Sequence, residues 1–438
     1  MFADGGIDAY ETAAAPTRAY VLHPDLKSVK SRRLPEHGLA EAVSLAAALP
    51  GLVVLGAEVV RLPRVQPGTL FGSGKVEDLK ATMNGLEIDL VLVDGPVTPV
   101  QQRNLEKEWG VKLLDRTGLI LEIFADRART REGVLQVELA ALSYQRTRLV
   151  RAWTHLERQR GGFGFVGGPG ETQIESDRRA IDDQVIRLKR QLDRVAKTRE
   201  LHRASRRKVP FPLVALVGYT NAGKSTLFNH MTGAEVLAKD MLFATLDPTM
   251  RGVVLPAIDG GVGRKVIVSD TVGFISELPT QLVAAFRATL EEVLEADLIL
   301  HVRDISHPET AEQAADVSDI LASLGVNKAV PMFEVWNKLD LVDASQREAL
   351  LVQATNRAGV FPVSALTGEG VADLLKAAST AFEEEKSQAL LTLSFSEGKR
   401  RSWLHDTGIV QQETQDETGW QISVLWTAKQ QGRYRELK

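Results

Sequence analysis

Hydrophobic positions between residues 17 and 130 occur in short runs that alternate with segments of helical period. The apolar runs are Arg18–Leu22, Leu52–Val60, Asp89–Val93 and Val111–Leu114, and the helical segments are Glu36–Leu49, Lys75–Met83 and Val100–Trp109. Alternation of strand and helix is typical of a parallel sheet with helices on its faces. Residues 17–130 are therefore predicted to form an N-terminal parallel α/β domain, preceded by a disordered tail at residues 1–16.

Residues 131–208 have the hydrophobic period of long helices instead. One apolar stripe contains Leu135, Leu139, Leu142, Leu149, Trp153 and Leu156, and a second contains Ile174, Ile181, Val185, Leu188, Leu192 and Val195. Each stripe fits one face of a helix. Residues 161–170 between them are too rich in glycine to be helical. The pattern predicts an antiparallel helical hairpin with a glycine-rich loop at its tip.

Strands and helices alternate again from residue 209 to residue 385, after the proline-rich boundary Val209–Pro212. The remaining residues, 386–438, contain predicted strands at Leu391–Phe395 and Ile422–Trp426. The predicted class is α/β. It comprises the N-terminal domain, the hairpin, a doubly wound and mostly parallel domain at 209–385, and a small mixed α+β C-terminal unit at 386–438.

The absence of cysteine restricts the kinds of site that the chain can form, whereas its net charge excludes nothing. The 438 residues are 44% hydrophobic and 25% charged, the net charge is −4, and there is no cysteine. Disulfides, thiolate zinc sites and iron–sulfur clusters are therefore excluded. The first residues lack the pattern of a secretory signal, and no apolar run reaches membrane-spanning length. We expect a cytoplasmic protein without stable membrane insertion.

A phosphate-binding loop follows the first apolar run of the third segment. Leu213–Val217 is a predicted buried strand, and Gly218–Ser225 has the pattern G-x-x-x-x-G-K-S ahead of a predicted helix. Glycines let the backbone curl so that several N–H groups point at phosphate oxygens, and the helix N-terminus adds a positive dipole end. Lys224 is expected to bind the β- and γ-phosphates, and Ser225 to ligate Mg²⁺.

Two further motifs follow later predicted strands. Asp270–Gly273 (D-T-V-G) offers a carboxylate for Mg²⁺ and a Gly273 N–H for the γ-phosphate. Asn337–Asp340 (N-K-L-D) offers a carboxylate that can accept hydrogen bonds from guanine N1–H and from the 2-amino group. Adenine lacks both donors, so Asp340 would be left unpaired against it, which gives steep discrimination. Asn337 is expected to tie this loop to the phosphate-binding loop, and the stem of Lys338 to lie over the ring.

The order of these motifs, each at a strand end, predicts a Mg²⁺-dependent GTPase. Ser364–Leu366 would supply an N–H to guanine O6. The predicted GTP-binding residues are Gly218, Tyr219, Thr220, Asn221, Ala222, Gly223, Lys224, Ser225, Phe243, Ala244, Thr245, Leu246, Asp247, Asp270, Thr271, Val272, Gly273, Asn337, Lys338, Leu339, Asp340, Ser364, Ala365 and Leu366. The predicted catalytic residues are Lys224, Thr245, Asp270 and Gly273, and the predicted metal ligands are Ser225 and Thr245.

The loop between the first two motifs is expected to order with GTP and to relax after hydrolysis. Thr245 is favoured over Thr249 as the residue that contacts Mg²⁺ and the γ-phosphate. Ras-like enzymes place a glutamine directly after D-x-x-G to orient the attacking water, whereas this chain has Phe274. A phenyl ring cannot orient water by hydrogen bonding. We therefore expect slow intrinsic hydrolysis that a partner or another loop stimulates.

These motifs resemble those of the HflX GTPases. The resemblance is carried by GYTNAGKS at Gly218–Ser225, FATLD at Phe243–Asp247, DTVGF at Asp270–Phe274 and GETQIESDRR at Gly170–Arg179. The segment Phe71–Lys75 is similar to the N-terminal G-S-G-K loop of that family. The resemblance covers the chain from about Thr17 to Glu384. It implies a factor that binds the large (50S) ribosomal subunit and its rRNA, and that splits stalled or idle ribosomes under stress.

Basic residues in and beside the hairpin are compatible with contacts to RNA phosphates. The predicted RNA-binding residues are Arg158, Arg160, Phe163, Phe165, Arg178, Arg179, Arg206 and Arg207. A solvated helix face is the plain alternative for such cations. Phe163 and Phe165 could stack on bases or equally pack under the hairpin.

Two other functions remain open at this point. A second nucleotide site at Gly72–Lys75 would indicate an RNA-binding, nucleotide-dependent remodelling enzyme. However, Lys75 is followed by Val76 instead of Ser or Thr, and Thr69 stands where the first glycine of a P-loop belongs. A non-ribosomal GTPase switch is the other alternative, although no lipidation motif supports a membrane role. A monomer is expected.

Overall fold

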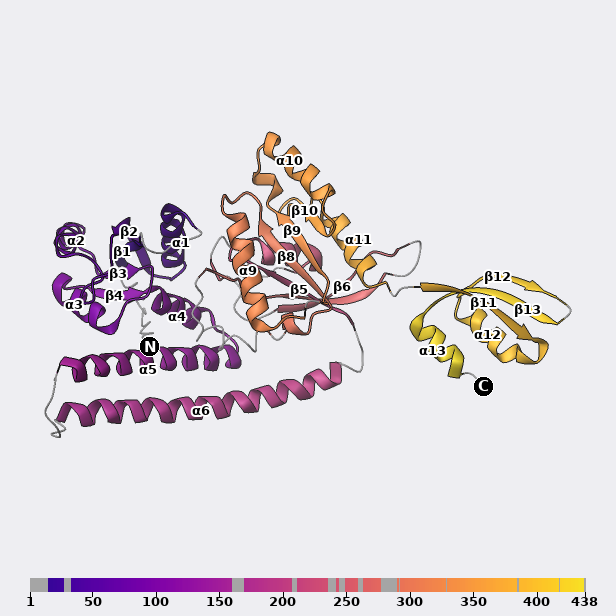
Figure 1. The fold of residues 1–438 in the computed structure, drawn as a ribbon, viewed down its shortest axis with the longest axis horizontal. Coiled ribbons are helices and arrows are strands. Elements are labelled where there is room, and N and C mark those ends of the chain that lie inside the picture. The colour runs from indigo at the N-terminus through magenta and orange to yellow at the C-terminus, as the bar shows by residue number, and fades with distance from the viewer. Residues whose placement is uncertain are drawn as a thin grey trace, which may run out of the picture. The chain divides into compact units, whose positions relative to one another are not determined.

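The structure is a computed structural model of the chain (Figure 1). It describes residues 15–26, 33–159, 169–206, 211–234, 242–243, 249–258, 263–276, 290, 292–327, 329–383, 386–416 and 418–436. The chain divides into two compact units. The first comprises Met1–Leu255 and Arg264–Leu375, and the second comprises Pro256–Gly263 and Lys376–Lys438. Each unit is described separately.

The first unit begins with a parallel four-stranded sheet of order β2-β1-β3-β4. Its strands are β1 (Thr17–Leu26), β2 (Leu52–Leu62), β3 (Leu90–Val93) and β4 (Lys112–Asp115), and its helices are α1 (Pro35–Ala47), α2 (Ser73–Gly85), α3 (Pro99–Trp109) and α4 (Arg116–Arg127). Apolar residues of α1 and α4 pack in one core cluster and those of α2 and α3 in another. The predicted parallel α/β arrangement is confirmed.

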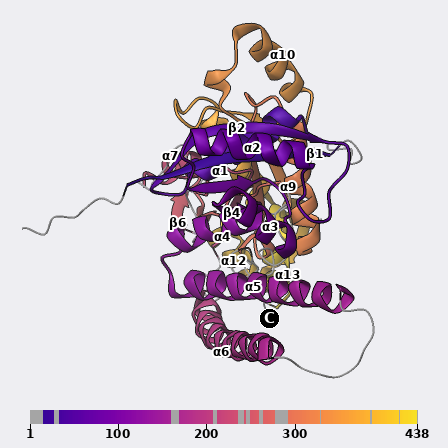
Figure 2. The ribbon, with the colours of Figure 1, turned by 90° about the vertical axis from the view of Figure 1, so that its left-hand side faces the viewer.

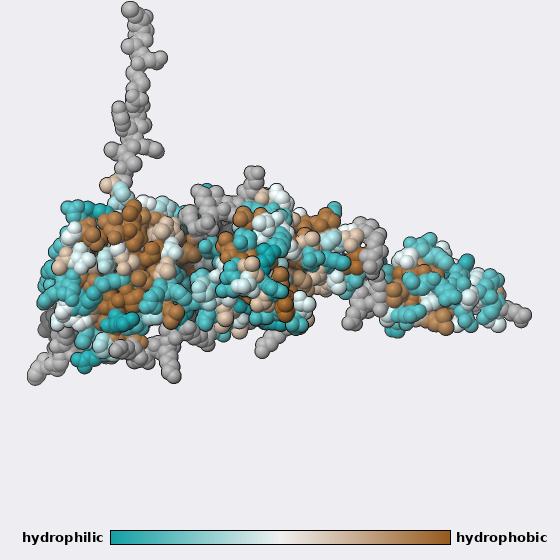
Figure 3. All heavy atoms as spheres, turned by 90° about the horizontal axis from the view of Figure 1, so that it is seen from above, coloured by the Kyte–Doolittle hydropathy of each residue, from teal (hydrophilic) through white to brown (hydrophobic). Residues whose placement is uncertain are grey.

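This sheet also carries apolar residues at the surface. Val53 and Leu55 of the edge strand β2 are exposed. Seen from above, apolar surface gathers over this part of the first unit (Figure 3).

Two long helices follow, α5 (Arg131–Gln159) and α6 (Pro169–Arg206). They run side by side in opposite directions (Figures 1 and 2). An ion pair between Arg146 of α5 and Asp182 of α6, 2.8 Å long, joins them, and Leu188 of α6 is buried. Gly170 was predicted to belong to the glycine-rich loop but lies in the first turn of α6, because the helix already begins at Pro169. A proline is favoured in that first turn, where its missing N–H has no helical partner.

A second sheet of six strands, of order β10-β9-β8-β5-β7-β6, forms the rest of the first unit. Its strands are β5 (Leu213–Gly218), β6 (Thr249–Val254), β7 (Lys265–Asp270), β8 (Leu298–Asp304), β9 (Met332–Asn337) and β10 (Val360–Pro362). All pairings are parallel except that of β6 with β7. Its helices include α7 (Lys224–Thr232), α9 (Thr310–Leu324), α10 (Ala344–Thr355) and α11 (Val371–Ala381). The carboxyl ends of β5, β7 and β9 carry the three motifs of the sequence.

The second unit contains an antiparallel sheet of order β11-β13-β12. Its elements are β11 (Lys386–Ser394), α12 (Gly398–Asp406), β12 (Val410–Gln415), β13 (Gly419–Thr427) and α13 (Ala428–Glu436). The predicted strand Leu391–Phe395 began five residues after the observed start of β11 and ended one residue after its observed end. Phe395 begins a short 3-10 turn because the Ser394 side chain and Glu397 cap that turn. Leu404, Ile422 and Trp426 form part of a separate apolar core.

Candidate guanine-nucleotide site

The phosphate-binding loop requires glycine at two positions. Gly218 ends β5 with φ 154°, and a Cβ there would lie 2.2 Å from the carbonyl oxygen of Val302 on the neighbouring strand β8. Gly223 has φ 89°, and a Cβ there would lie 2.2 Å from Nδ2 of Asn337. The left-handed conformation at Gly223 turns the chain directly into α7, so that the helix N-terminus faces the loop. The backbone therefore curls ahead of the N-terminus of α7, in the form that the predicted phosphate-binding loop needs.

Lys224 is the first residue of α7, and its side chain is buried against the loop. Its Nζ donates hydrogen bonds to the carbonyl oxygens of Gly218 (3.1 Å) and Tyr219 (2.8 Å). Burial lowers the pKa of Lys224 to about 8, although the nearby Asp270 acts in the opposite direction. The ammonium is thus held at the centre of the curve, where a phosphate would meet it.

Ser225 and Asp270 lie together beside Lys224. The hydroxyl of Ser225 donates to Oδ2 of Asp270 over 2.7 Å, and Asp270 at the end of β7 has no exposed surface. A hydroxyl and a carboxylate are hard oxygen donors, and Mg²⁺ is commonly held by one or two such groups together with phosphates and water. The pair fits Mg²⁺. Within the part of the chain that the structure describes, no cluster of three His, Cys, Asp or Glu side chains offers another metal site.

The segment after Asp270 lies directly on the phosphate-binding loop. The N–H of Phe274 donates to Gly218 O (3.1 Å), and the N–H of Thr220 donates to Phe274 O (2.7 Å). A Cβ on Gly273 would lie 3.1 Å from Nζ of Lys224. Gly273 is therefore next to Lys224, the lysine predicted to bind phosphate. The side chain of Phe274 is buried and does not point to solvent.

Asn337 connects the base-recognition loop to the phosphate-binding loop. Its Nδ2 donates to Ala222 O (2.8 Å), and its Oδ1 accepts from the N–H of Ala365 (2.9 Å). The Ser364 hydroxyl donates to Oδ1 of Asp340 over 2.5 Å and orients that carboxylate at the surface. The three segments predicted to contact guanine thus meet in one place.

Lys338 has the left-handed φ of 65°, and its Nζ pairs with Asp304 Oδ2 at the end of β8 over 2.8 Å. This pair fixes the direction of the lysine stem, which is the group expected to cover the purine ring.

The loop between the first two motifs is described only in part. Phe243 is buried with φ 56°, and its ring meets the ring of Phe124 edge-on at 4.6 Å between centroids. The Phe243 side chain thus packs into the core cluster that also contains apolar residues of α1 and α4. The predicted contacts Ala244, Thr245, Leu246 and Asp247 lie outside the described residues. Thr249 is the first residue of β6, paired with Asp270 of β7.

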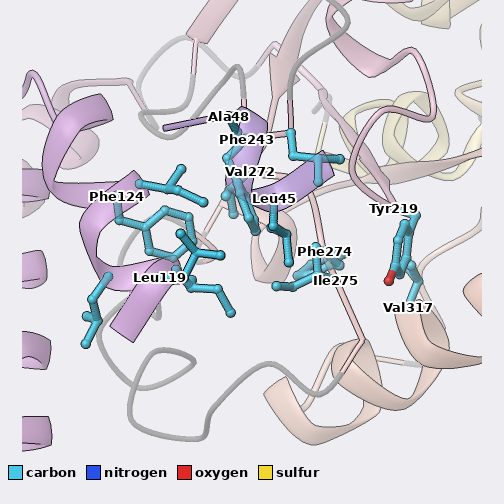
Figure 4. Packing of buried hydrophobic residues seen from close by; sticks show 14 of the residues in the cluster. Leu45, Ala48, Leu119, Phe124, Tyr219, Phe243, Val272, Phe274, Ile275 and Val317 are labelled. Atoms are coloured by element: carbon cyan, nitrogen blue, oxygen red, sulfur yellow. The ribbon is translucent and has the colours of Figure 1, made fainter. Parts of the chain in front are cut away.

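Residues of the N-terminal sheet domain, which runs from β1 to α4 (Thr17–Arg127), reach the phosphate-binding loop, and the sequence did not indicate this contact. Glu41 on α1 accepts a hydrogen bond from the Tyr219 hydroxyl over 2.5 Å. Arg116, at the start of α4, donates to Glu41 and to Ser276 O. Figure 4 shows Leu45 of α1 in the same cluster as Tyr219, Phe274 and Ile275. These partners are far apart in sequence, and no motif marks Glu41.

The predicted RNA-binding residues are placed only in part. Arg178 and Arg179 are exposed on α6, and Arg178 lies 4.0 Å from Asp182. Arg158 and Arg206 belong to α5 and α6, but their side chains are outside the description, as are Arg160, Phe163, Phe165 and Arg207 entirely. The Gly72–Lys75 segment caps and opens α2, where Lys75 pairs with Glu58 over 3.0 Å.

Family models match nearly the whole chain in consecutive segments. Residues 36–125 match the "GTP-binding GTPase N-terminal" model and residues 127–206 the "GTP-binding GTPase Middle Region" model. Residues 213–338 match the "50S ribosome-binding GTPase" model, and residues 349–434 match the "HflX C-terminal domain" model.

Curated relatives are similar over most of their length. A protein named GTPase HflX from Magnetococcus marinus is 50% identical over 90% of this chain and 88% of its own length. The GTPase HflX of Escherichia coli is 43% identical over 81% of each chain. A crystal structure of a GTP-binding protein from Sulfolobus solfataricus in complex with GDP is 23% identical, covers 83% of this chain and 98% of that one, and has a TM-score of 0.44. No helix among the described residues is long and apolar enough to cross a bilayer.

Proposed function

This chain belongs to the HflX family of GTPases, and we propose that it binds the large ribosomal subunit when loaded with GTP and splits stalled or idle ribosomes under stress. The GTPase activity itself follows from family membership and from the phosphate-binding domain. The observation that carries the ribosomal part is the match of residues 213–338 to the 50S ribosome-binding GTPase model. We also propose that the protein is cytoplasmic and monomeric.

We propose separate tasks for the parts of the GTP site. Lys224 and the loop N–H groups would bind the β- and γ-phosphates, and Gly273 N–H would contact the γ-phosphate. Ser225 would ligate Mg²⁺, with Asp270 holding it through water and the unplaced Thr245 as a further ligand. When bound, Mg²⁺ neutralises charge that develops on the phosphate oxygens. Asp340, oriented by Ser364, would recognise guanine.

We also propose that the ribosome stimulates hydrolysis. Phe274 occupies the place of the water-orienting glutamine, and its side chain is buried in the core cluster. No atom of that ring can orient water. The attacking water would therefore be ordered by a group supplied when the ribosome binds, which is a common arrangement among GTPases.

Exposed cations on α6 support contact with ribosomal RNA. The exposed basic residues there are Arg178, Arg179, Arg187, Lys189, Arg190, Arg194 and Lys197. Cations on a long helix can neutralise several backbone phosphates at once. RNA contact by Arg158, Arg160, Phe163, Phe165, Arg206 and Arg207 remains part of the same proposal.

The proposal is tested by co-sedimentation with ribosomal subunits and by light scattering of intact ribosomes. With a non-hydrolysable GTP analogue we expect the protein to pellet with the large subunit, and with GTP we expect scattering to fall as ribosomes separate. The Lys224→Ala variant, which should not bind triphosphate, is the control for both. Equal binding with GDP, or nucleotide-independent binding to free RNA, would instead favour the non-ribosomal switch or the RNA-remodelling enzyme.

A further inference from the structure

Glu41 connects the N-terminal sheet domain to two segments of the GTP site at once. Its Oε2 accepts from the Tyr219 hydroxyl over 2.5 Å, and its Oε1 accepts from the Ser276 hydroxyl over 3.1 Å. The Tyr219 hydroxyl in turn accepts from the backbone N–H of Ser276 over 2.7 Å. Tyr219 belongs to the phosphate-binding loop and Ser276 to the segment after D-x-x-G. A single carboxylate therefore holds these two segments together.

The same two segments are joined by backbone hydrogen bonds nearer the phosphate site. Gly218 and Thr220 bond to Phe274, which lies between Gly273 and Ser276 in the chain. Gly273 is held so closely that an added Cβ would lie 2.9 Å from the Cα of Thr220. Displacing Ser276 from Tyr219 would release one end of the stretch from Gly273 to Ser276. The contact made by Glu41 therefore adds a tie at Ser276 to the backbone bonds that hold the stretch containing Gly273.

Two guanidinium groups hold the Glu41 carboxylate in place. Arg33 donates to Oε2 over 2.7 Å and lies 5.1 Å over the Tyr219 ring, and Arg116 bonds to Oε1. Burial alone would raise the pKa of Glu41, but Arg116 and Arg33 lower it below its usual 4.5. The exposed fraction of the Glu41 side chain is 12%, and that of Arg116 is 7%. The acceptor is thus a fixed, ionised group inside the protein.

We propose that Glu41 is a positioning residue for the GTPase reaction. Through Tyr219 and Ser276 it holds Gly273 where its N–H meets the γ-phosphate, and so it contributes to the preference for GTP over GDP. This inference concerns the nucleotide site alone and does not depend on ribosome binding.

The γ-phosphate supplies a readout that general destabilisation would not reproduce. GDP contacts the loop and Lys224 but has no group for the Gly273 N–H to meet. Loss of the positioning contact should therefore weaken a GTP analogue and leave GDP affinity unchanged. A defect in folding or in the loop itself would weaken both nucleotides together.

The test measures the affinity of the full-length protein, without ribosomes, for GDP and for a non-hydrolysable GTP analogue in the presence of Mg²⁺. The variants are Glu41→Gln, which loses the charge, Tyr219→Phe, which loses only the hydroxyl, and the double variant. Glu58→Gln is the matched control because its partner Lys75 lies within the N-terminal sheet domain. Thermal melting of each variant monitors the fold.

We expect Glu41→Gln and Tyr219→Phe each to reduce affinity for the GTP analogue by about tenfold, the effect of one lost hydrogen bond to a charged group. The GDP affinity of each variant should stay within about twofold of the wild-type value. The double variant should lose less affinity than the sum of the two single losses, because the hydrogen bond between Glu41 and Tyr219 is absent in both single variants. Single-turnover hydrolysis should slow in both, and Glu58→Gln should match the wild type.

The proposal is overturned if GDP and the GTP analogue weaken by the same factor, or if neither affinity changes. Additive losses in the double variant would also overturn it, because two independent contacts would then be involved. An increase in affinity for the GTP analogue in Glu41→Gln would show that Glu41 holds the segment away from the phosphate, which is the opposite of its proposed role.

Discussion

At the scale of the residue, the nucleotide site depends on positions where a side chain would collide with backbone or with a functional group. Gly223 has a left-handed backbone, and the place that its Cβ would take is occupied by Asn337, a residue predicted to contact the purine. The loop can approach the base-recognition segment only because this position has no side chain. The phosphate and base parts of the site are therefore coupled through one glycine.

Replacing Gly223 with alanine should reduce both stability and nucleotide binding. A non-glycine residue in a left-handed conformation costs about 1–2 kcal/mol, and displacement of Asn337 adds to that cost. Thermal unfolding and GDP titration measure the two effects. Gly252→Ala is the control, because Gly252 of β6 has open space around its Cβ position. Equal melting temperatures and GDP affinities for the two variants would contradict this interpretation.

At the scale of the element, the sequence predicted most strands of the N-terminal sheet to within a few residues but did not predict α4. Seven residues of α4 are buried, so its apolar positions do not form a single stripe. It packs against its own sheet and against Phe243 at the same time. A helix covered on more than one side has no clear amphipathic period, which is the signal that sequence analysis uses.

Separation along the sequence explains which parts of the site could be predicted. The phosphate, D-x-x-G and base-recognition motifs are local, because each is a short stretch at a strand end. Glu41 escaped prediction because it meets Tyr219 across 178 residues, and a glutamate within a predicted helix is ordinarily a solvated residue. The strand β6 was not predicted, and only its first residue, Thr249, had been assigned, to the loop before D-x-x-G.

The packing of α4 on Phe243 predicts a large stability effect at one position. Phe124 is 1% exposed, and Phe124→Ala should lower the free energy of unfolding by about 3–5 kcal/mol, because it leaves a cavity between α4 and Phe243. Phe211→Ala is the matched control, since Phe211 is 44% exposed. Denaturant unfolding measures both variants. A loss of less than about 1 kcal/mol in Phe124→Ala would show that this contact is absent in solution.

Asp94, which follows β3, should make a contribution to the free energy of unfolding that is lost in acid. Burial would raise its pKa, but Arg116, which donates to Oδ1 over 2.6 Å, lowers it below the usual 3.8. A carboxyl with a lowered folded-state pKa stabilises the fold above its unfolded value, and that stabilisation is lost as pH falls through the folded-state value. The stability difference between wild type and Asp94→Asn should therefore be largest near neutral pH.

Denaturant unfolding of wild type and Asp94→Asn, at neutral pH and then in steps below pH 3.8, measures that difference. The difference should be about 3–5 kcal/mol at neutral pH, because Asp94→Asn removes a carboxylate charge that pairs with the buried Arg116. It should become smaller in acid. A difference that stays constant across this range would contradict the assignment.

At the scale of the whole molecule, the chain joins a GTP site to a long basic helix within one compact unit. Binding to a ribosome through that helix would release counterions from RNA and would therefore weaken steeply as salt increases. The triple variant Arg190→Gln, Arg194→Gln, Lys197→Gln should lower the magnitude of the slope of log K against log salt by up to about three. Sedimentation with ribosomes across a salt series measures it.

A matched triple variant at Arg61, Arg64 and Lys112 removes exposed cations from the N-terminal sheet domain instead. This control should leave the slope close to that of the wild type. An equal change of slope in both triple variants would show that net charge, and not the face of α6, governs binding.

In the proposed site, Asp340 recognises guanine while the loop around Lys224 binds the triphosphate. The most direct test is to measure the dissociation constants of wild type and Asp340→Asn for GTP, ATP and xanthosine triphosphate in one titration series. The wild type should prefer GTP. Asp340→Asn should reduce the affinity for GTP by about a hundredfold or more. It should increase the affinity for xanthosine triphosphate, because an amide can donate to the 2-oxo group of xanthine. Equal binding of ATP and GTP by the wild type, or an unchanged GTP affinity in Asp340→Asn, would contradict the account.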